Sequence, residues 1–230
     1  MSGKFDPEKR FNDRAKVYDG DILKIIPGYA ALHETALHLL ETTLPEDAYV
    51  LVAGVGTGNE AVTLASRNPG WRITGFDIAE NMIKASGEKV ARLGLGDRIE
   101  LIHGGLDDVL QESFDAAACL LVTHFIPYEK KLEFLRAIAF RLNPGAKLVT
   151  ADFTGDRKSD EFGQFVKAWE SYQLETREPE DVAEGLKHTR HDLDILSHEE
   201  AISHLEEAGF RDVRLFWKSL VFSGYIAERE

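Results

Sequence analysis

The 230-residue sequence contains one cysteine, Cys119, and no hydrophobic run long enough to cross a membrane. A lone cysteine cannot form an internal disulfide, and the apolar residues around Cys119 indicate a buried small side chain, not a nucleophile. A membrane helix needs about 20 apolar residues, and the longest apolar runs here, such as AAACLLV, are far shorter. The charged start, MSGKFDPEKRFNDR, lacks the apolar segment of a signal peptide. We therefore expect a cytoplasmic protein with no membrane partner.

Positive charge is also scarce. The chain has 27 Lys and Arg against 40 Asp and Glu, a formal net charge of −13. Nucleic-acid binding needs a concentrated positive face, because counterion release supplies much of the affinity. The basic clusters here are no longer than EKK or RLNPGAK. Direct contact with nucleic acid is therefore not expected, and a small-molecule substrate is. The stretch His188–Asp192 lacks a third well-spaced ligand, so no metal site is predicted.

What the sequence does contain is a regular alternation of strand-like and helical segments. Strands are predicted at 49–53, 71–76, 98–103, within 114–122 and at 146–153. Helices are predicted between them, with a long one over 128–142 and an earlier one from Tyr29 to about Leu44. This alternation indicates a mainly parallel sheet with helices on both faces. Segments 212–220 and 221–228 predict a closing antiparallel hairpin.

The alternation is interrupted over residues 154–196, which are polar, with helical signals near 159–176 and no strand signal. Such a long insertion between core elements is typical of a lid. A capping box at Ser197–Glu200 predicts the next helix. Residues 1–28 are polar and mixed, with no element predicted before the Pro27-Gly28 turn.

We predict an α/β fold whose open Rossmann-like sheet has about seven strands, mainly parallel with an antiparallel C-terminal strand, plus a helical lid. The predicted domains are an N-terminal arm and helix (1–44), a core (45–153 and 197–230) and the lid insertion (154–196).

The strongest local motif is the glycine triplet in VLVAGVGTGNE, after the first predicted strand. Gly54, Gly56 and Gly58 have no Cβ, so the backbone can pass close to a ligand and then turn into a helix. The free N–H groups at the helix start can bind polar groups of that ligand. Asp77 ends the second strand about 20 residues later, where an open α/β fold places a carboxylate beside ribose hydroxyls. Asp77 also fits the N-cap of the next helix, and the two roles are compatible.

The tight spacing Gly-x-Gly-x-Gly differs from the dinucleotide fingerprint, G-x-G-x-x-G. It is followed in order by FDIAENMI, IELIHGGLDD, FDAAACLLVTHFI and LRAIAFRLNPGAKLVTADF. This ordered series resembles the class I S-adenosylmethionine-dependent methyltransferases, and the helix EEAISHLEEAGF with the last two strands fits the same family. The resemblance covers about residues 45–153 and 197–230.

The resemblance implies S-adenosylmethionine as cofactor and S-adenosylhomocysteine as product. The implied cofactor-binding residues are Gly54, Gly56, Gly58, Asp77, Ile78, Met82, Gly105, Leu106, Leu120 and Leu121. Two positions depart from the family pattern. Val52 stands where an acidic residue is usual, and Gly105 stands where an Asp is usual beside the adenine. Asp107 or Asp108 could compensate at the second position.

The N-terminal segment FNDRAKVYDGDILKIIPGYAALHE resembles the carboxy-S-adenosylmethionine synthases that serve tRNA wobble-uridine modification. Phe11, Arg14 and the Pro27-Gly28-Tyr29 turn match that family in order and spacing. The resemblance implies that Tyr29 closes over the cofactor; a turn before an amphipathic helix is the alternative that needs no ligand. Neither Arg177 nor Arg190 aligns firmly with that family's arginine, and Leu120 replaces its Asn, which favours plain methyl transfer.

His124 is the candidate catalytic base or substrate contact. It follows the fourth predicted strand, at the carboxyl edge where open α/β sheets bind ligands. Histidine titrates near neutral pH, which suits proton transfer. Packing by Phe125 and Tyr128 is the alternative role for His124. Asp152, at the end of the fifth strand, is a weaker candidate that could instead cap the turn before the lid.

In the lid, Trp169, Tyr172 and Arg190 are the candidate substrate contacts, although both aromatic residues could equally seal the lid to the core. Phe216 and Trp217 fit either a homodimer surface or packing within the sheet.

The predicted function is transfer of a methyl group from S-adenosylmethionine to a small-molecule acceptor. Two alternatives stay open: a carboxy-S-adenosylmethionine synthase-like enzyme and a non-catalytic protein that binds an adenosyl ligand. A nicotinamide dehydrogenase is a more distant alternative.

Overall fold

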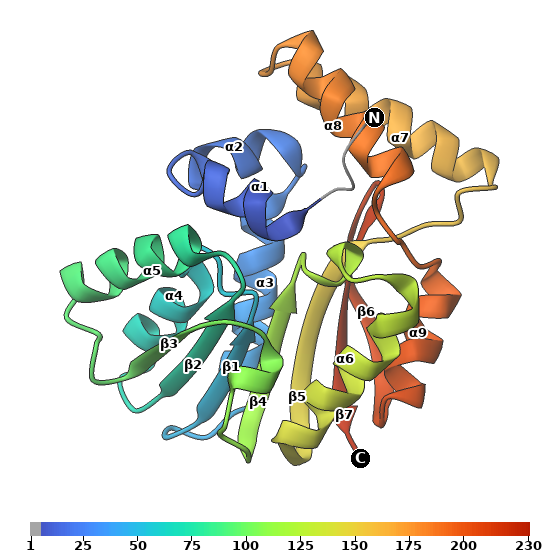
Figure 1. Ribbon diagram of the computed structural model, residues 1–230. Helices are drawn as coiled ribbons and strands as arrows, with labels where there is room; N and C mark the ends of the chain where they lie inside the picture. Colours follow the sequence, from blue (N-terminus) through green and yellow to red (C-terminus); the bar gives the residue numbers. More distant parts are fainter. Residues whose placement is uncertain (1–5) are drawn as a thin grey trace.

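The centre of the molecule is a seven-stranded sheet with the order β3-β2-β1-β4-β5-β7-β6, shown for residues 6–230 in the computed structural model (Figure 1). The strands are β1 (Tyr49–Ala53), β2 (Arg72–Asp77), β3 (Ile99–His103), β4 (Phe114–Leu120), β5 (Leu142–Phe153), β6 (Phe210–Ser219) and β7 (Phe222–Arg229). The first five pair in parallel, and β7 is antiparallel to both β5 and β6. The predicted fold class is confirmed. Residues 1–5, the start of the predicted arm, lie outside the described residues.

Helices cover both faces of this sheet. They are α3 (Tyr29–Glu41), α4 (Asn59–Arg67), α5 (Glu80–Arg92), α6 (Tyr128–Arg141) and α9 (His198–Glu207). In β1, Val50 and Val52 face the core that contains α3 and α4, whereas Leu51 and Ala53 face the core that contains α6 and α9. Alternate residues of a strand point to opposite faces, so this short strand contributes to two hydrophobic cores. Continuous apolar runs such as YVLVA follow from that double burial.

The N-terminal segment forms two helices, α1 (Pro7–Arg14) and α2 (Tyr18–Ile25), where the sequence predicted no element. Asp6 accepts a hydrogen bond from the Lys9 amide at 3.2 Å and caps α1, and Pro7 begins that helix. None of the residues in α1 and only Ile22 in α2 is buried. Each helix has only eight residues, fewer than the window of about 11–18 residues over which a hydrophobic period is recognised, which explains why the sequence pattern missed them.

Side-chain hydrogen bonds fix the two arm helices to the core. Asp19 of α2 accepts from Thr57 Oγ1 at 2.6 Å and from Lys89 Nζ at 3.1 Å. Asn12 of α1 accepts from the Asn81 amide at 2.8 Å through its Oδ1. The arm is therefore docked against the glycine loop and α5, above the carboxyl edge of the sheet.

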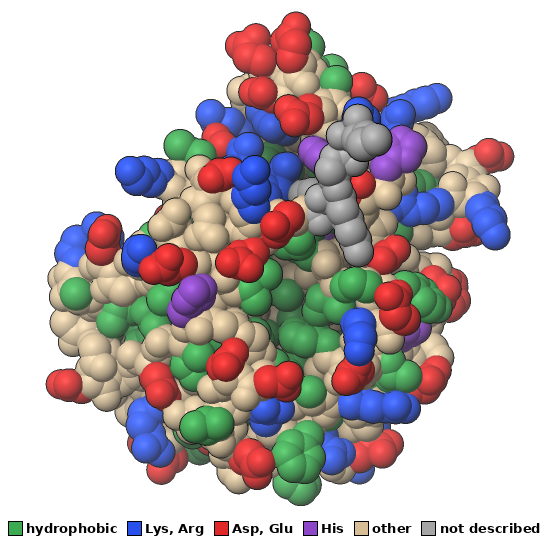
Figure 2. Space-filling view, in the orientation of Figure 1, with side chains coloured by type: hydrophobic (Ala, Val, Ile, Leu, Met, Phe, Trp, Pro, Cys, Tyr) green, Lys and Arg blue, Asp and Glu red, His purple; other side chains and the backbone are tan. Residues whose placement is uncertain are grey.

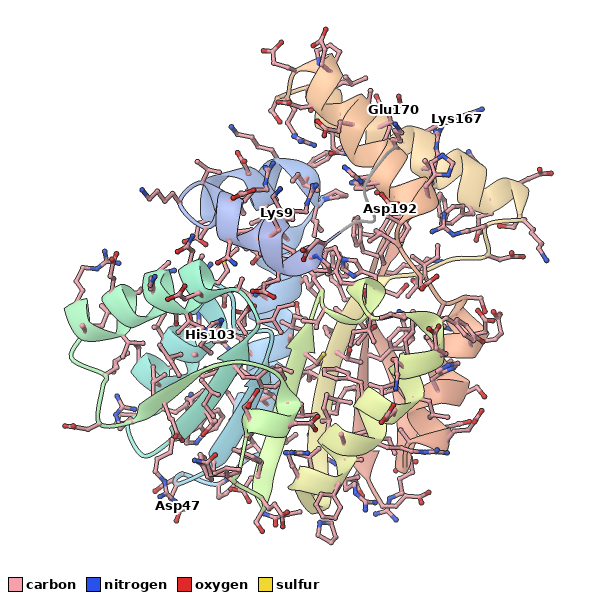
Figure 3. The ribbon with its side chains drawn as sticks, viewed as in Figure 1. Lys9, Asp47, His103, Lys167, Glu170 and Asp192 are labelled. Atoms are coloured by element: carbon pink, nitrogen blue, oxygen red, sulfur yellow. The ribbon has the colours of Figure 1, made fainter. Side chains whose placement is uncertain are left out.

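The segment predicted as a lid contains α7 (Asp160–Leu174) and α8 (Pro179–His191), at the top of Figure 1, and α7 lies beside α2. The sequence predicted only the first of these helices. Trp169 Nε1 donates to the Ile25 carbonyl at 2.6 Å, and Tyr172 Oη donates to the Leu23 carbonyl at 2.9 Å. The two aromatic residues thus join the lid to the arm. Lys167 and Glu170 of the same helix carry charge on its outer side (Figure 3).

Two predicted boundaries change slightly. Helix α6 ends at Arg141 and β5 begins directly at Leu142, because Leu142 pairs with Phe114 of β4 and Asn143 Nδ2 donates to Asp115 at 3.0 Å. The capping box at Ser197 is confirmed. Over residues 6–230, no helix has both the length and the apolar character needed to span a membrane.

Candidate functional site

A cavity of about 500 Å³, here called the main cavity, opens between the carboxyl ends of the strands and α1. Hydrophobic side chains gather in this hollow below the arm (Figure 2). Nine of the predicted cofactor residues line it: Gly54, Gly56, Asp77, Ile78, Met82, Gly105, Leu106, Leu120 and Leu121. The structure therefore brings together residues that lie on four different strand–helix connections. Gly58 and Tyr29 do not line the main cavity.

The three glycines of the first loop have different surroundings. All have left-handed backbones, with φ of 66° at Gly54, 53° at Gly56 and 85° at Gly58. A Cβ on Gly58 would collide with Ser86 of α5, so this glycine allows α4 to pack closely on α5. A Cβ on Gly56 would meet only the Gly54 carbonyl oxygen, at 3.9 Å. Gly56 therefore leaves open space at the cavity wall.

Asp77 connects the second strand to the glycine loop. Its Oδ2 accepts from the Gly56 amide at 2.9 Å, and its Oδ1 accepts from the Ala79 amide at 2.8 Å. Burial raises the pKa of Asp77, against the opposing effect of these two backbone donors. The carboxylate thus orders both loops while it lines the main cavity.

Gly105, another lining residue of the main cavity, also leaves open space. A Cβ at this position would have no neighbour within 4 Å, and its backbone is not left-handed. Asp108 Oδ2 accepts from the Gly105 amide at 2.8 Å and thereby caps the short 3₁₀ helix at Leu106–Asp108. Of the two acids predicted to compensate for the missing family Asp, Asp107 lines the main cavity and Asp108 does not.

A small polar cavity lies beside the glycine loop, lined by Tyr29, His33 and Glu60 and bordered by Gly54 and Gly56. Glu60 Oε1 pairs with His33 Nδ1 at 3.1 Å, and the Glu60 side chain is 11% exposed. His33 Nε2 is buried and has no hydrogen-bond partner among the described residues. The Tyr29 ring lies 4.0 Å from the His33 ring. Tyr29 therefore faces the small cavity, with His33, and not the main one.

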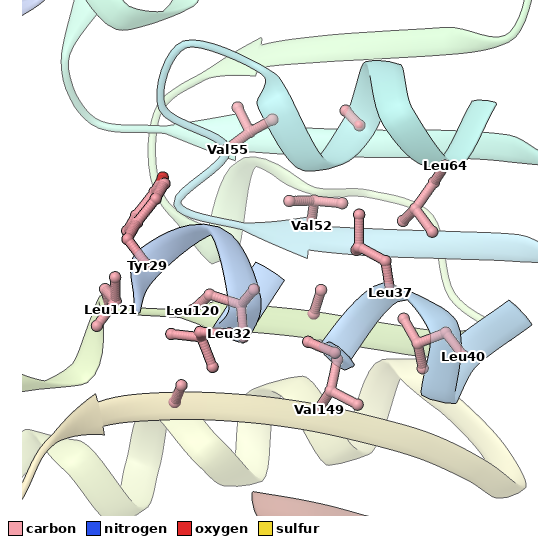
Figure 4. Close-up of a cluster of buried hydrophobic side chains, with 14 of the residues drawn as sticks. Tyr29, Leu32, Leu37, Leu40, Val52, Val55, Leu64, Leu120, Leu121 and Val149 are labelled. Atoms are coloured by element: carbon pink, nitrogen blue, oxygen red, sulfur yellow. The ribbon is translucent and has the colours of Figure 1, made fainter. Parts of the chain in front are cut away.

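The departure at Val52 has a clear structural setting. Val52 is 2% exposed and belongs to the hydrophobic core beneath α3, together with Leu32 and Leu37 (Figure 4). A carboxylate at this position would be buried among aliphatic side chains, which is costly without a partner. Glu60 is the acidic residue that lines the small cavity instead.

Leu121 lies where the cavities meet. It follows the end of β4, has a left-handed backbone with φ of 63°, and donates its amide to the Ala151 carbonyl at 2.7 Å. A leucine in this conformation is strained, and such strain concentrates at functional sites. Leu121 lines the main cavity, the small polar cavity and a third cavity between arm and lid.

That third cavity, about 130 Å³ in volume, is here called the arm–lid cavity. It shares four wall residues with the main cavity: Phe11, Tyr18, Leu121 and Phe125. Its charged or titratable lining residues are Arg10, Arg14, Tyr18, Asp21, His124, Arg177 and His188. Because the two cavities share these lining residues, they lie next to each other and can hold a cofactor and a second reactant side by side.

His124 is buried at the boundary of the arm–lid cavity and pairs with Asp152 at the end of β5. His124 Nδ1 hydrogen-bonds Asp152 Oδ1, which also accepts from the His124 amide at 3.2 Å. Burial tends to raise the pKa of Asp152, but the charge of His124 and hydrogen bonds from His124 and Thr123 outweigh it, so the pKa lies below its ordinary value. Among the described residues, no hydrogen bond to His124 Nε2 is found. Asp152 thus orients His124, a pairing that neither residue's sequence context indicated.

The three predicted substrate residues have different positions. Trp169 lines the arm–lid cavity, whereas Tyr172 does not and instead bonds to Leu23. Arg190 is exposed and lines none of the cavities described above. Arg177 does line the arm–lid cavity.

Sequence reasoning did not assign a role to Arg10 or Tyr18. Arg10 and Arg14 are four residues apart in RFNDR, which would have placed them on one helical face had the arm helix been predicted.

Cys119, Phe216 and Trp217 are packed against other parts of the sheet and of the turn before α3. Cys119 is buried within β4, and burial raises the pKa of its thiol far above the ordinary value. Trp217 packs against Gly28 in the turn before α3, and Phe216 packs over Gly224 of the neighbouring strand. Within residues 6–230, no group of three His, Cys, Asp or Glu side chains is arranged to hold a metal ion.

Comparisons with known proteins agree with this geometry. Residues 51–148 match the family Methyltransf_12, described as a methyltransferase domain. The carboxy-S-adenosyl-L-methionine synthase of Campylobacter hominis is 24% identical over 217 residues, which cover 94% of this chain and 92% of that protein.

Two solved structures share the fold. An O-methyltransferase family 2 protein from Planctomyces limnophilus, in complex with apigenin, has a TM-score of 0.66 at 16% identity, covering 100% of this chain and 63% of that one. Human N-acetylserotonin methyltransferase, in complex with S-adenosylmethionine, has a TM-score of 0.64 at 16% identity, covering 96% of this chain and 56% of that one. This chain is thus shorter than either. These findings agree with the methyltransferase family that the ordered motifs predicted: the domain match covers residues 51–148, and the solved structures share the fold.

Proposed function

We propose that this chain, a class I S-adenosylmethionine-dependent methyltransferase, binds its cofactor in the main cavity and methylates a small molecule held in the arm–lid cavity. The observation that carries the proposal is the shared wall of the two cavities, formed by Phe11, Tyr18, Leu121 and Phe125. His124 stands on the acceptor side of that wall.

The residues of the main cavity fit the cofactor. Gly56 and Gly105 both line this cavity and leave space that any Cβ would fill. The Asp77 carboxylate between them suits ribose hydroxyls, and the apolar Ile78 and Met82 suit the adenine ring. When bound, S-adenosylmethionine supplies a methyl group already activated on a sulfonium and leaves as S-adenosylhomocysteine.

The small polar cavity suits the amino-acid end of the cofactor. The buried Glu60 carboxylate pairs with His33 and lines this cavity, so it would compensate the charge of an ammonium group bound there. The unpartnered His33 Nε2 offers a further polar contact for the cofactor carboxylate. In this arrangement Glu60 takes the place of the acidic residue that Val52 replaces, and Tyr29 closes the small cavity.

His124 acts as the general base in this proposal. Asp152 binds Nδ1, which fixes the tautomer and leaves Nε2 to take a proton from the acceptor nucleophile. The acceptor's lone pair forms the new bond to the methyl carbon, and the electrons of the broken sulfur–carbon bond stay on sulfur. The buried Asp152 carboxylate then stabilises the imidazolium. Phe125, whose ring lies 4.0 Å from that of His124, helps to exclude water.

A second function is favoured by one observation: similarity to the carboxy-S-adenosyl-L-methionine synthase of Campylobacter hominis extends over 94% of the chain. In that case the modified molecule would be the cofactor itself. The apolar Leu120 and Leu121 beneath the proposed sulfonium position favour methyl transfer over this alternative.

Mass spectrometry of small molecules released from the purified protein separates these functions. We expect S-adenosylmethionine or S-adenosylhomocysteine in the extract of the wild type and neither in that of Gly105→Leu, whose side chain would occupy the cavity. A species heavier by one carboxyl group would support the synthase function. Absence of every adenosyl ligand, with no thermal shift on adding S-adenosylmethionine, would contradict both.

A further inference from the structure

The charge of the arm–lid cavity is opposite to that of the whole protein. The chain carries a net charge of −13, yet three arginines and one acid line this cavity. The arginines come from two segments far apart in sequence: Arg10 and Arg14 from α1, and Arg177 from the loop between the two lid helices. Figure 2 shows Lys and Arg side chains gathered where arm and lid meet, above the hydrophobic hollow. By contrast, the neighbouring Lys9 is exposed on the arm (Figure 3).

The acids nearby do not balance these charges within the cavity. Arg14 Nη2 pairs with Asp21 Oδ2 at 2.5 Å, and Asp21 is the only Asp or Glu among the lining residues. Arg177 donates to the neutral side chain of Gln173. Glu184 attracts Arg10, and Asp181 attracts Arg177, but neither carboxylate lines the cavity.

The three arginines are close enough to repel one another. Burial lowers the pKa of Arg10, and the positive charges of Arg14 and Arg177 lower it further. Burial likewise lowers the pKa of Arg177, with the charge of Arg14 as a second cause. All three side chains are half-buried, so water screens this repulsion incompletely. An anion in the cavity would relieve it.

The rest of the cavity wall is mainly apolar or aromatic, with Gln173 and Thr189 as polar exceptions. Ile22, Ile25 and Ile26 of the arm face Phe153, Trp169 and Phe222 of the core and lid. A cavity of about 130 Å³ with such walls accepts a small apolar body, not a chain of polar groups. His124 lies on the same wall as Leu121 and Phe125, next to the main cavity.

From this arrangement we propose that the acceptor is a small molecule with an apolar body and one anionic group, a carboxylate or a phosphate. Arg10, Arg14 and Arg177 hold the anionic group, and the nucleophile of the acceptor faces His124. The guanidinium groups recognise the anion by charge-assisted hydrogen bonds, and Trp169 and Phe153 cover the apolar body. This inference rests on the proposed function, because it assigns the arm–lid cavity to the acceptor.

A matched pair of probes tests the inference. 4-Hydroxyphenylacetate and its neutral amide have the same shape and differ in charge, and each is titrated calorimetrically into protein saturated with S-adenosylhomocysteine. Benzoate and phenyl phosphate serve as further anions. The variants are Arg10→Gln, Arg177→Gln and the double variant; the control is Arg190→Gln, an exposed arginine of the same lid outside the cavity.

We expect the wild type and Arg190→Gln to bind at least one of the anions, and the acid about tenfold or more tightly than its amide if that pair binds. The double variant should lose the anion preference. Equal affinity for acid and amide, retained preference in the double variant, or no binding of any of the three anions at about 5 mM would overturn the inference. Because S-adenosylhomocysteine binding is measured in the same samples, failure here with the cofactor bound leaves the proposed function intact.

Discussion

The main cavity and the arm–lid cavity are built by different means. The main cavity is formed by loops at the ends of buried parallel strands, and its key residues are glycines, one carboxylate and aliphatic side chains. The arm–lid cavity is formed by short helices that meet through a few hydrogen bonds, and it carries arginines and a buried histidine. Loops at the carboxyl ends of buried strands are held rigidly by the sheet, whereas helices docked on the surface tolerate amino-acid substitution more readily. The first arrangement suits a constant cofactor and the second a particular acceptor.

The largest effect is expected from closing the main cavity. Gly105→Leu introduces a side chain into open space without a left-handed backbone penalty, so S-adenosylhomocysteine binding should weaken about hundredfold or more in calorimetry. Gly96→Leu is the matched control, because a Cβ at Gly96 also has no neighbour within 4 Å but lies away from the cavity. If Gly105→Leu binds S-adenosylhomocysteine with unchanged affinity, the main cavity is not the site of the adenosyl ligand.

The second effect concerns the wall between the cavities. His124→Gln removes the proposed base, so transfer of labelled methyl to a hydroxyl acceptor should slow by about a hundredfold to ten-thousandfold. S-Adenosylhomocysteine affinity should stay at the wild-type value, because His124 does not line the main cavity. A variant that keeps full turnover would leave His124 as a packing residue beside Phe125.

A smaller effect is expected in the small polar cavity. Glu60→Gln keeps the shape of the side chain but removes its charge, so S-adenosylhomocysteine should bind about tenfold more weakly. 5′-Methylthioadenosine, which lacks the amino-acid end, is the control ligand and should bind both proteins equally. If both ligands lose affinity together, Glu60 supports the glycine loop and does not contact the ammonium.

The smallest effect concerns the joint between arm and lid. Tyr172→Phe removes one hydrogen bond, to the Leu23 carbonyl, and should lower the free energy of unfolding by about 1 kcal/mol in urea titrations. Cofactor affinity should not change, because Tyr172 lines neither chamber. A marked loss of S-adenosylhomocysteine binding would show that the arm and the main cavity are more tightly coupled than the contacts indicate.

The same contrast explains what the sequence could predict. Gly54, Gly56 and Asp77 follow strands with continuous apolar runs, so their convergence at one sheet edge followed from the alternation of elements. The pairing of His124 with Asp152 could not be predicted, because it depends on the register of β4 against β5.

The structure of the arm and lid was harder still to predict from the sequence. Helices α1 and α2 have only eight residues each, too few for a hydrophobic period to be recognised, so the sequence assigned no role to Arg10. In the lid, Arg190 was the predicted substrate contact, whereas Arg177 lines the arm–lid cavity. Tyr29 was predicted to close over the cofactor; it lines the small polar cavity and not the main one, and Leu121 belongs to the walls of both cavities. Which side chains line which cavity cannot be predicted from a single sequence.

The most direct test of the account is calorimetric titration of S-adenosylhomocysteine into the ligand-free wild type and into Asp77→Asn. We predict one site per chain, with affinity about tenfold or more weaker in Asp77→Asn, because the charged acceptor for the ribose hydroxyls is lost. Wild-type protein that shows neither heat nor a thermal shift with S-adenosylhomocysteine or S-adenosylmethionine would contradict the central claim that the main cavity is a cofactor site.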